Sequence, residues 1–62
     1  MNMRLKLKVI ERFQTQADFA AAIGEDESTV SRAIRGRRQL SADKKKTWAD
    51  SLGCKPHEIF ED

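Results

Sequence analysis

The positions of glycine and proline constrain this 62-residue chain more than any other feature. Gly24, Gly36, Gly53 and Pro56 separate segments that have the length of short helices, and these two residue types commonly stand at helix ends and turns. A chain of this size can bury at most one small hydrophobic core. We therefore expect a single domain, residues 1–62, in which every segment packs around that core.

The beginning of the chain fits two patterns. Alternate residues from Met3 to Val9 are apolar, as in a strand, whereas Met3, Leu7, Ile10 and Phe13 share one face of a helix. No other segment has the pattern of a strand, and an isolated pair of strands is only marginally stable. We therefore predict a helix from Met3 to Phe13 and an all-α fold.

Residues that cap helices precede the later segments. Thr15, with Asp18 three positions on, resembles a capping box, and Asp26 and Ser41 can cap the two helices that follow. Pro56 favours the first turn of a last, short helix. We expect helices over about 16–23, 27–35 and 42–52, and a final turn over 56–60.

The third predicted helix has two different faces. Only Glu25 and Asp26 separate it from Gly24, so it must turn sharply away from the preceding helix, as in a helix-turn-helix over residues 16–35. On a helical wheel one side carries the apolar Val30, Ala33 and Ile34, and the other carries Ser28, Ser31, Arg32 and Arg35. The polar side is therefore free to contact a partner.

The stretch "QADFAAAIGEDESTVSRAIRG", from Gln16 to Gly36, resembles the phage-repressor and Cro type of helix-turn-helix, the lambda-repressor-like family. A second stretch, "LSADKKKTWADSLGCKPHEIF", is similar to the fourth and fifth helices of that family. The resemblance covers about residues 4–60 and implies a compact four- to five-helix bundle. It also implies sequence-specific binding to double-stranded DNA, with the third helix in the major groove.

The resemblance places base-reading residues at the start and middle of the third helix. Arg32 can offer paired donors to guanine, and short hydroxyl side chains can approach base edges. Glu27 can accept from the amino group of cytosine, or it can simply stabilise the positive end of the helix dipole. The predicted base-reading residues are Glu27, Ser28, Thr29, Ser31 and Arg32.

Positive charge is concentrated after the middle of the chain. Residues 32–46 hold seven basic residues and one acidic residue, a net charge of +6, whereas the remainder carries −4. Such polarity suits docking on a polyanion, although mixed charge can also simply solvate helix surfaces. The predicted phosphate contacts are Arg35, Arg37, Arg38 and Lys44, together with Gln16, which the resemblance places at a phosphate-contacting position at the start of the second helix. The three lysines at 44–46 point in different directions on a helix, so at least one is expected to face solvent.

The residues present give little support to a disulfide, a metal site or an enzymatic activity. Cys54 is the only cysteine, so an internal disulfide is impossible and a zinc site is not expected. A catalytic pair of Cys54 and His57 is not expected, because so short a chain lacks room for a pocket and a third orienting group. Trp48 has the helical spacing of a core residue with Leu52. We expect neither an enzyme nor any cofactor, metal or small-molecule ligand. No apolar run reaches membrane-spanning length, and we expect a soluble, cytoplasmic protein of a bacterial cell, associated with the nucleoid.

The function favoured by these observations is that of a small phage or prophage-type repressor or Cro-like regulator. A domain of this size would bind a pseudo-palindromic operator as a homodimer, and the resemblance places the dimer surface near the fourth and fifth helices, including exposed parts of "KPHEIFED". The alternative is a protein-interaction module of the same fold, such as an antitoxin-like partner or adaptor, whose arginines meet an acidic protein. An RNA-binding role is disfavoured because exposed aromatic residues for base stacking are lacking.

Overall fold

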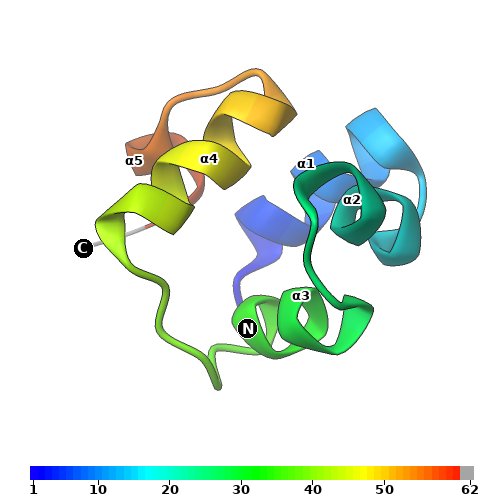
Figure 1. Cartoon of the computed structure of the whole chain (residues 1–62). Coiled ribbons are helices and arrows are strands. Elements are labelled where there is room, and N and C mark those ends of the chain that lie inside the picture. The colour runs from blue at the N-terminus through cyan, green and yellow to red at the C-terminus, as the bar shows by residue number, and fades with distance from the viewer. Residues whose placement is uncertain (61–62) are drawn as a thin grey trace.

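The computed structural model describes residues 1–60, which form five α helices and contain no strand (Figure 1). The helices are α1 (Met3–Phe13), α2 (Gln16–Ile23), α3 (Glu27–Ile34), α4 (Ala42–Leu52) and α5 (Pro56–Ile59). The expected all-α bundle is confirmed, and the third helix ends one residue before its expected limit. Among the described helices none is both long and apolar enough to cross a lipid bilayer.

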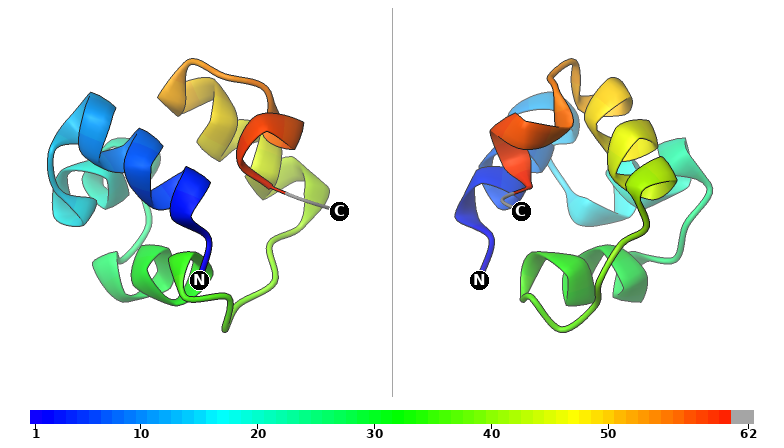
Figure 2. Two further views of the ribbon diagram at one scale, coloured as in Figure 1. Left: turned by 180° about the vertical axis from the view of Figure 1, so that it is seen from behind. Right: turned by 90° about the vertical axis from the view of Figure 1, so that its left-hand side faces the viewer.

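The central element of the bundle is α1, which contacts each of the other four helices. Seen from behind in Figure 2, α1 crosses the molecule with α5 beside it and α3 below. The segment 35–41 runs along the same end of the molecule as α3 before α4 begins (Figure 1). This arrangement leaves α3 at one end of the bundle.

An aromatic chain runs through the core. Trp48 is 1% exposed, and its ring meets that of Phe19 edge-on, with centroids 5.5 Å apart and planes at 86°, a favoured geometry for aromatic pairs. Phe13 extends this chain on one side and Phe60 on the other. Trp48 is therefore a core residue, as predicted. The buried apolar residues are Leu5, Val9, Phe19, Ala20, Val30, Ala33, Ile34, Leu40, Trp48, Ala49, Leu52, Ile59 and Phe60.

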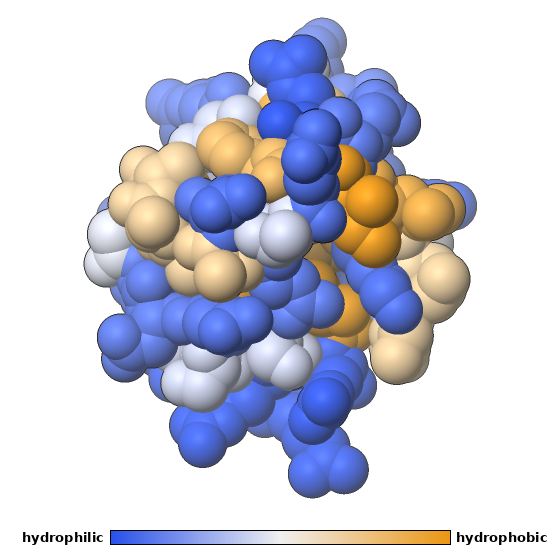
Figure 3. Space-filling model, turned by 90° about the vertical axis from the view of Figure 1, so that its right-hand side faces the viewer, coloured by the Kyte–Doolittle hydropathy of each residue, from blue (hydrophilic) through white to orange (hydrophobic). Residues whose placement is uncertain are grey.

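The apolar face that favoured a helix in the sequence is not the face of α1 that packs inward. Leu5 and Val9 are fully buried, whereas Met3, Leu7 and Ile10 are 50%, 58% and 45% exposed. Figure 3, which shows the right-hand side of the molecule of Figure 1, has apolar residues at the surface among hydrophilic ones. Because α1 is apolar on two faces, its periodicity alone cannot decide which one packs inward.

The start of α1 is anchored by Asn2, its N-cap residue. The Asn2 side-chain oxygen accepts from the backbone N–H of Leu5 at 3.0 Å. The Asn2 backbone N–H donates to the carbonyl of Ile34 at 2.6 Å, and its side-chain amide donates to that of Ile59 at 2.7 Å. These bonds join the start of α1 to the end of α3 and to α5.

Side-chain caps begin two of the other helices as predicted. The Thr15 hydroxyl accepts from the N–H of Asp18 at 3.1 Å, and the Ser41 hydroxyl accepts from that of Lys44 at 3.2 Å. Asp26 occupies the N-cap position of α3, but its side chain makes no capping hydrogen bond. Its contribution is therefore negative charge near the positive end of the helix dipole.

Gly24 ends α2 in the left-handed conformation, with φ of 72° and ψ of 31°. Its N–H faces the carbonyls of the last turn of α2, and the N–H of Glu25 donates to the carbonyl of Ala20 at 2.9 Å. This is a common helix ending that satisfies carbonyls lacking a partner within the helix. The predicted sharp turn between α2 and α3 is confirmed.

Candidate DNA-binding surface

The exposed edge of α3 is held in place by its apolar back. Val30, Ala33 and Ile34 are 0%, 7% and 2% exposed, which matches the predicted inward face. On the other side Ser28, Arg32 and Arg35 are exposed, and Thr29 and Ser31 are half-buried. The short turn after Gly24 and the buried back together hold a polar edge outward at the end of the molecule (Figure 1).

The predicted base-reading residues occupy different parts of this edge. Glu27 and Ser28 lie in the exposed first turn, and Arg32 follows Ser28 by four residues on the same line of the helix. Thr29 is on the side that is partly covered. Ser31 lies on the flank that faces α1 and α2, where it lines a pocket with Gln16.

Exposed guanidinium groups surround the end of α3. Arg35 is the C-cap residue, and Arg37 and Arg38 follow Gly36 in the segment that leads to α4. All three arginines are exposed, and none forms an ion pair with another described residue. Leu40 is buried and anchors this segment against the core. The three cations therefore lie beside the edge of α3 with their charge available.

The lysines of α4 have different surroundings. Lys44 pairs with the carboxylate of Glu25, which ties the first turn of α4 to the turn between α2 and α3. The Lys45 ammonium lies 5.9 Å from the centroid of the Phe60 ring. Lys46 is exposed. Of the predicted phosphate contacts, Lys44 thus differs from the arginines because its charge is already engaged within the protein.

Cys54 is half-buried and packs against the core. Burial raises the pKa of its thiol, and the nearby charge of Glu58 raises it further, whereas Lys8 and Arg12 oppose the change. His57 is exposed on α5. Within residues 1–60 no three side chains of the metal-binding types come together.

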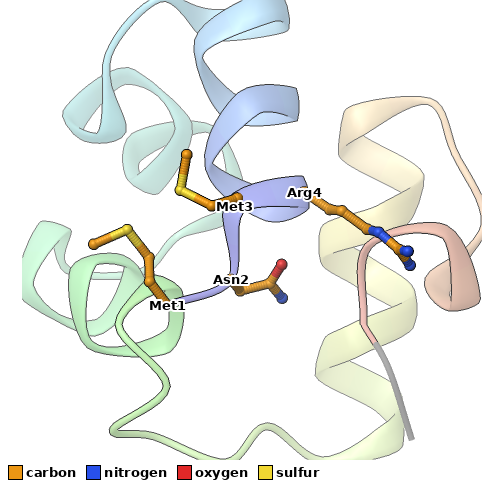
Figure 4. A pocket seen from close by; sticks show the side chains of 4 residues that line it. All are labelled: Met1, Asn2, Met3 and Arg4. Atoms are coloured by element: carbon orange, nitrogen blue, oxygen red, sulfur yellow. The ribbon is translucent and has the colours of Figure 1, made fainter.

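A hollow of about 400 Å³ lies at the start of α1 and is lined by Met1, Asn2, Met3 and Arg4. Figure 4 shows that these side chains spread apart, with Arg4 pointing towards α5 and the two methionines on the other side of the chain. Because its polar groups do not converge, this hollow lacks the arrangement expected of a ligand site.

A helix-turn-helix family of the Cro/C1 type matches residues 15–59. The chain belongs to this family. The match confirms the resemblance seen in the sequence, and the Cro/C1-type family consists of DNA-binding transcription regulators. This Cro/C1-type chain is accordingly a DNA-binding regulator that acts on double-stranded DNA. No curated protein and no solved structure matches the chain significantly.

Two residues that the sequence did not single out matter for this Cro/C1-type surface. Asn2 fixes the end of α3 through Ile34. An asparagine directly before the predicted start of a helix is a cap signal, but nothing in the sequence indicates its bond to Ile34. Lys6 lines the same pocket as Gln16 and Ser31. Nothing local marks Lys6, because its position depends on which face of α1 packs inward.

Proposed function

We propose that this chain is a small phage or prophage-type repressor or Cro-like regulator that occupies an operator and reads it through the major groove with residues 27–35. The observation that carries the proposal is the edge of α3, on which Ser28 and Arg32 are exposed over a buried apolar back. A helix presented in this way fits the width of the major groove of B-form DNA.

The reading residues have distinct roles in this proposal. Arg32 donates to the two acceptors of a guanine, and Ser28 and Thr29 contact neighbouring base edges. Glu27, exposed in the first turn of α3, accepts from a cytosine amino group. A carboxylate beside phosphates is unfavourable unless it finds such a donor, so Glu27 adds specificity by penalising other bases.

Orientation on the duplex comes from contacts to phosphates. Arg35, Arg37 and Arg38 supply these contacts near the end of α3, and Gln16 supplies one from the first turn of α2. Lys44 can join them only by leaving Glu25, with which it is paired. The arginines therefore provide most of the affinity that is independent of sequence.

A homodimer on a pseudo-palindromic operator completes the proposal, with half-sites about one helical turn apart. The expected surface near α4 and α5 cannot use Ile59 or Phe60, because both are buried within the protomer. Exposed residues such as Lys55 and His57 remain at that end, and residues 61–62 lie outside the described part of the chain. Such a polar contact is weak, so the dimer should form mainly on DNA.

Selection of bound sequences from random duplex DNA tests the proposal, followed by titration of the selected site at several salt concentrations. We expect a symmetric consensus and a steep linear fall of log affinity with log salt, because bound cations displace counterions from phosphates. A lack of enrichment together with a flat salt response would instead favour the protein-interaction module, in which the arginines meet an acidic protein.

A further inference from the structure

A pocket of about 160 Å³ lies where α1, α2 and α3 meet. Its polar lining comes from all three helices: Lys6 from α1, Gln16 from α2, and Ser31 with Arg35 from the end of α3. Met1 and Ile34 complete the wall. Residues far apart in the chain thus converge on one small space.

The chemistry of the lining suits an anion. Lys6 and Arg35 each carry a positive charge, and Gln16 and Ser31 can donate from an amide and a hydroxyl. No acidic side chain lines the pocket. Lys6, Gln16 and Ser31 are half-buried, so part of each side chain is shielded from water, and such shielding strengthens hydrogen bonds to an oxyanion.

The pocket lies beside the edge of α3 that faces DNA in the proposed function. Ser31 and Arg35 are four residues apart and therefore lie on one line of α3, on the flank towards α1 and α2. A helix in the major groove has a sugar-phosphate backbone on either side. The flank that carries Ser31 and Arg35 consequently faces one of these two backbones.

We propose that this pocket binds one phosphodiester group of the DNA, with Lys6 as a phosphate ligand beside Gln16, Ser31 and Arg35. The inference rests on the proposed function and adds α1, which precedes the family match at residues 15–59, to the binding surface. It also moves Ser31 from reading bases to holding the backbone.

Lys8 provides a matched control on the same helix. Residues two positions apart in a helix are separated by about 200° around its axis, so Lys6 and Lys8 project to different sides of α1. Lys8 lines a separate hollow with Leu7, Glu11, Glu58 and Ile59, and its ammonium lies 3.8 Å from the carboxylate of Glu11. Lys6→Gln and Lys8→Gln remove the same charge, but only the first removes it from the pocket.

The experiment measures dissociation constants of the wild type, Lys6→Gln, Lys8→Gln and Lys6→Arg at several salt concentrations. The DNA is the selected operator and a scrambled duplex of equal length. For Lys6→Gln we expect the slope of log affinity against log salt to become shallower by about 0.9, the value for one lost phosphate contact on B-form DNA. The loss should be similar on both duplexes, and Lys6→Arg should keep the wild-type slope.

Ethylation interference supplies a second readout that does not depend on overall affinity. At one phosphate per half-site, ethylation should interfere less strongly with Lys6→Gln than with the wild type, because Gln16, Ser31 and Arg35 still contact that phosphate, and as strongly with Lys8→Gln as with the wild type. Equal slopes and equal interference patterns for the two variants would overturn the inference and leave the proposed function intact. Salt-independent binding, or none, by the wild type would overturn the proposed function and this inference with it.

Discussion

The side-chain amide of Asn2 donates a hydrogen bond to the main-chain carbonyl of Ile59 at 2.7 Å, across a separation of 57 residues. The same side chain accepts from the N–H of Leu5 and so caps α1. One residue at the start of the described chain therefore both begins a helix and fastens the last helix to it. The end of α3, the helix proposed to face DNA, is tied to the same junction, because the Asn2 backbone N–H also donates to the carbonyl of Ile34.

Separate substitutions should distinguish the two roles of Asn2. Asn2→Ser keeps a good cap but cannot reach Ile59, and leaving that carbonyl without its donor should cost about 1–3 kcal/mol of unfolding free energy. Asn2→Ala removes the cap as well and should cost a further ~1 kcal/mol. Urea unfolding followed by circular dichroism measures both values. A serine variant as stable as the wild type would show that the bond to Ile59 contributes nothing.

Leu5 and Leu7 allow the same chemical change on opposite sides of α1. Leu5 is fully buried and Leu7 is 58% exposed. Leu5→Ala should therefore cost about 2–5 kcal/mol, enough to unfold much of so small a domain, whereas Leu7→Ala should change stability by less than about 0.5 kcal/mol. Thermal melting of the two variants measures the difference, and the reverse order would mean that the face of α1 with Leu7 packs inward.

The outcome for α1 shows where sequence reasoning reaches its limit. Helix ends were predictable because their signals are local: Thr15 and Ser41 accept from an N–H three residues on, and Gly24 adopts a conformation that other residues resist. The rotation of α1 was not predictable, because the helix is apolar on two faces and contacts with distant parts of the chain, among them the core around Leu5 and Val9, decide which one is buried. The end of α1 at Phe13 was predicted correctly although no glycine follows it, and Gln14 takes there a φ of 70°, where glycine would be expected.

The same distinction applies to the candidate site. The edge of α3 was predictable from the helical period, because Val30 and Arg32 differ in polarity and lie on different sides of one helix. The pairing of Lys44 with Glu25 and the place of Lys6 beside Gln16 depend on how helices pack. Such contacts between helices cannot be predicted from the spacing of residues in the sequence.

The loss of stability on replacing Gly24 should depend only on how readily the new residue adopts the left-handed backbone conformation. A Cβ atom there would meet no heavy atom within 4 Å, so steric contact with neighbours adds no cost. Gly24→Ala should lose about 1–2 kcal/mol because the left-handed conformation brings Cβ close to the carbonyl oxygen. Gly24→Asn should lose less and Gly24→Val more. Normal melting of the valine variant would refute the assignment of this turn.

Arg32 and Arg37 should differ in the kind of binding they support. Arg32→Ala should weaken binding to the preferred operator by about 1–3 kcal/mol and relax the preference at one base position, whereas Arg37→Ala should weaken all duplexes to a similar extent. Binding to a panel of operators with single base changes measures both effects. If the two variants gave the same profile across the panel, the division into reading and orienting arginines would be wrong.

Cys54 should react slowly in the folded protein. Burial and the charge of Glu58 raise the pKa of its thiol, so less of the reactive thiolate is present at neutral pH than in an unfolded chain. Alkylation by iodoacetamide should be slow at pH 7 and should accelerate above the ordinary pKa of a thiol. Mass spectrometry of the native and urea-unfolded protein measures the two rates.

The pKa shift at Cys54 also sets the direction of a pH effect on stability. A folded-state pKa above the unfolded value favours the native state at low pH, and this contribution is lost as pH rises through the folded-state pKa.

Glu58→Gln removes one of the two causes of the raised Cys54 pKa and keeps an oxygen that can accept from the N–H of Lys55, as Glu58 does at 2.6 Å. Native alkylation should therefore be faster in Glu58→Gln at the same pH, with the unfolded rate nearly unchanged. An unchanged native rate would mean that burial alone governs this thiol.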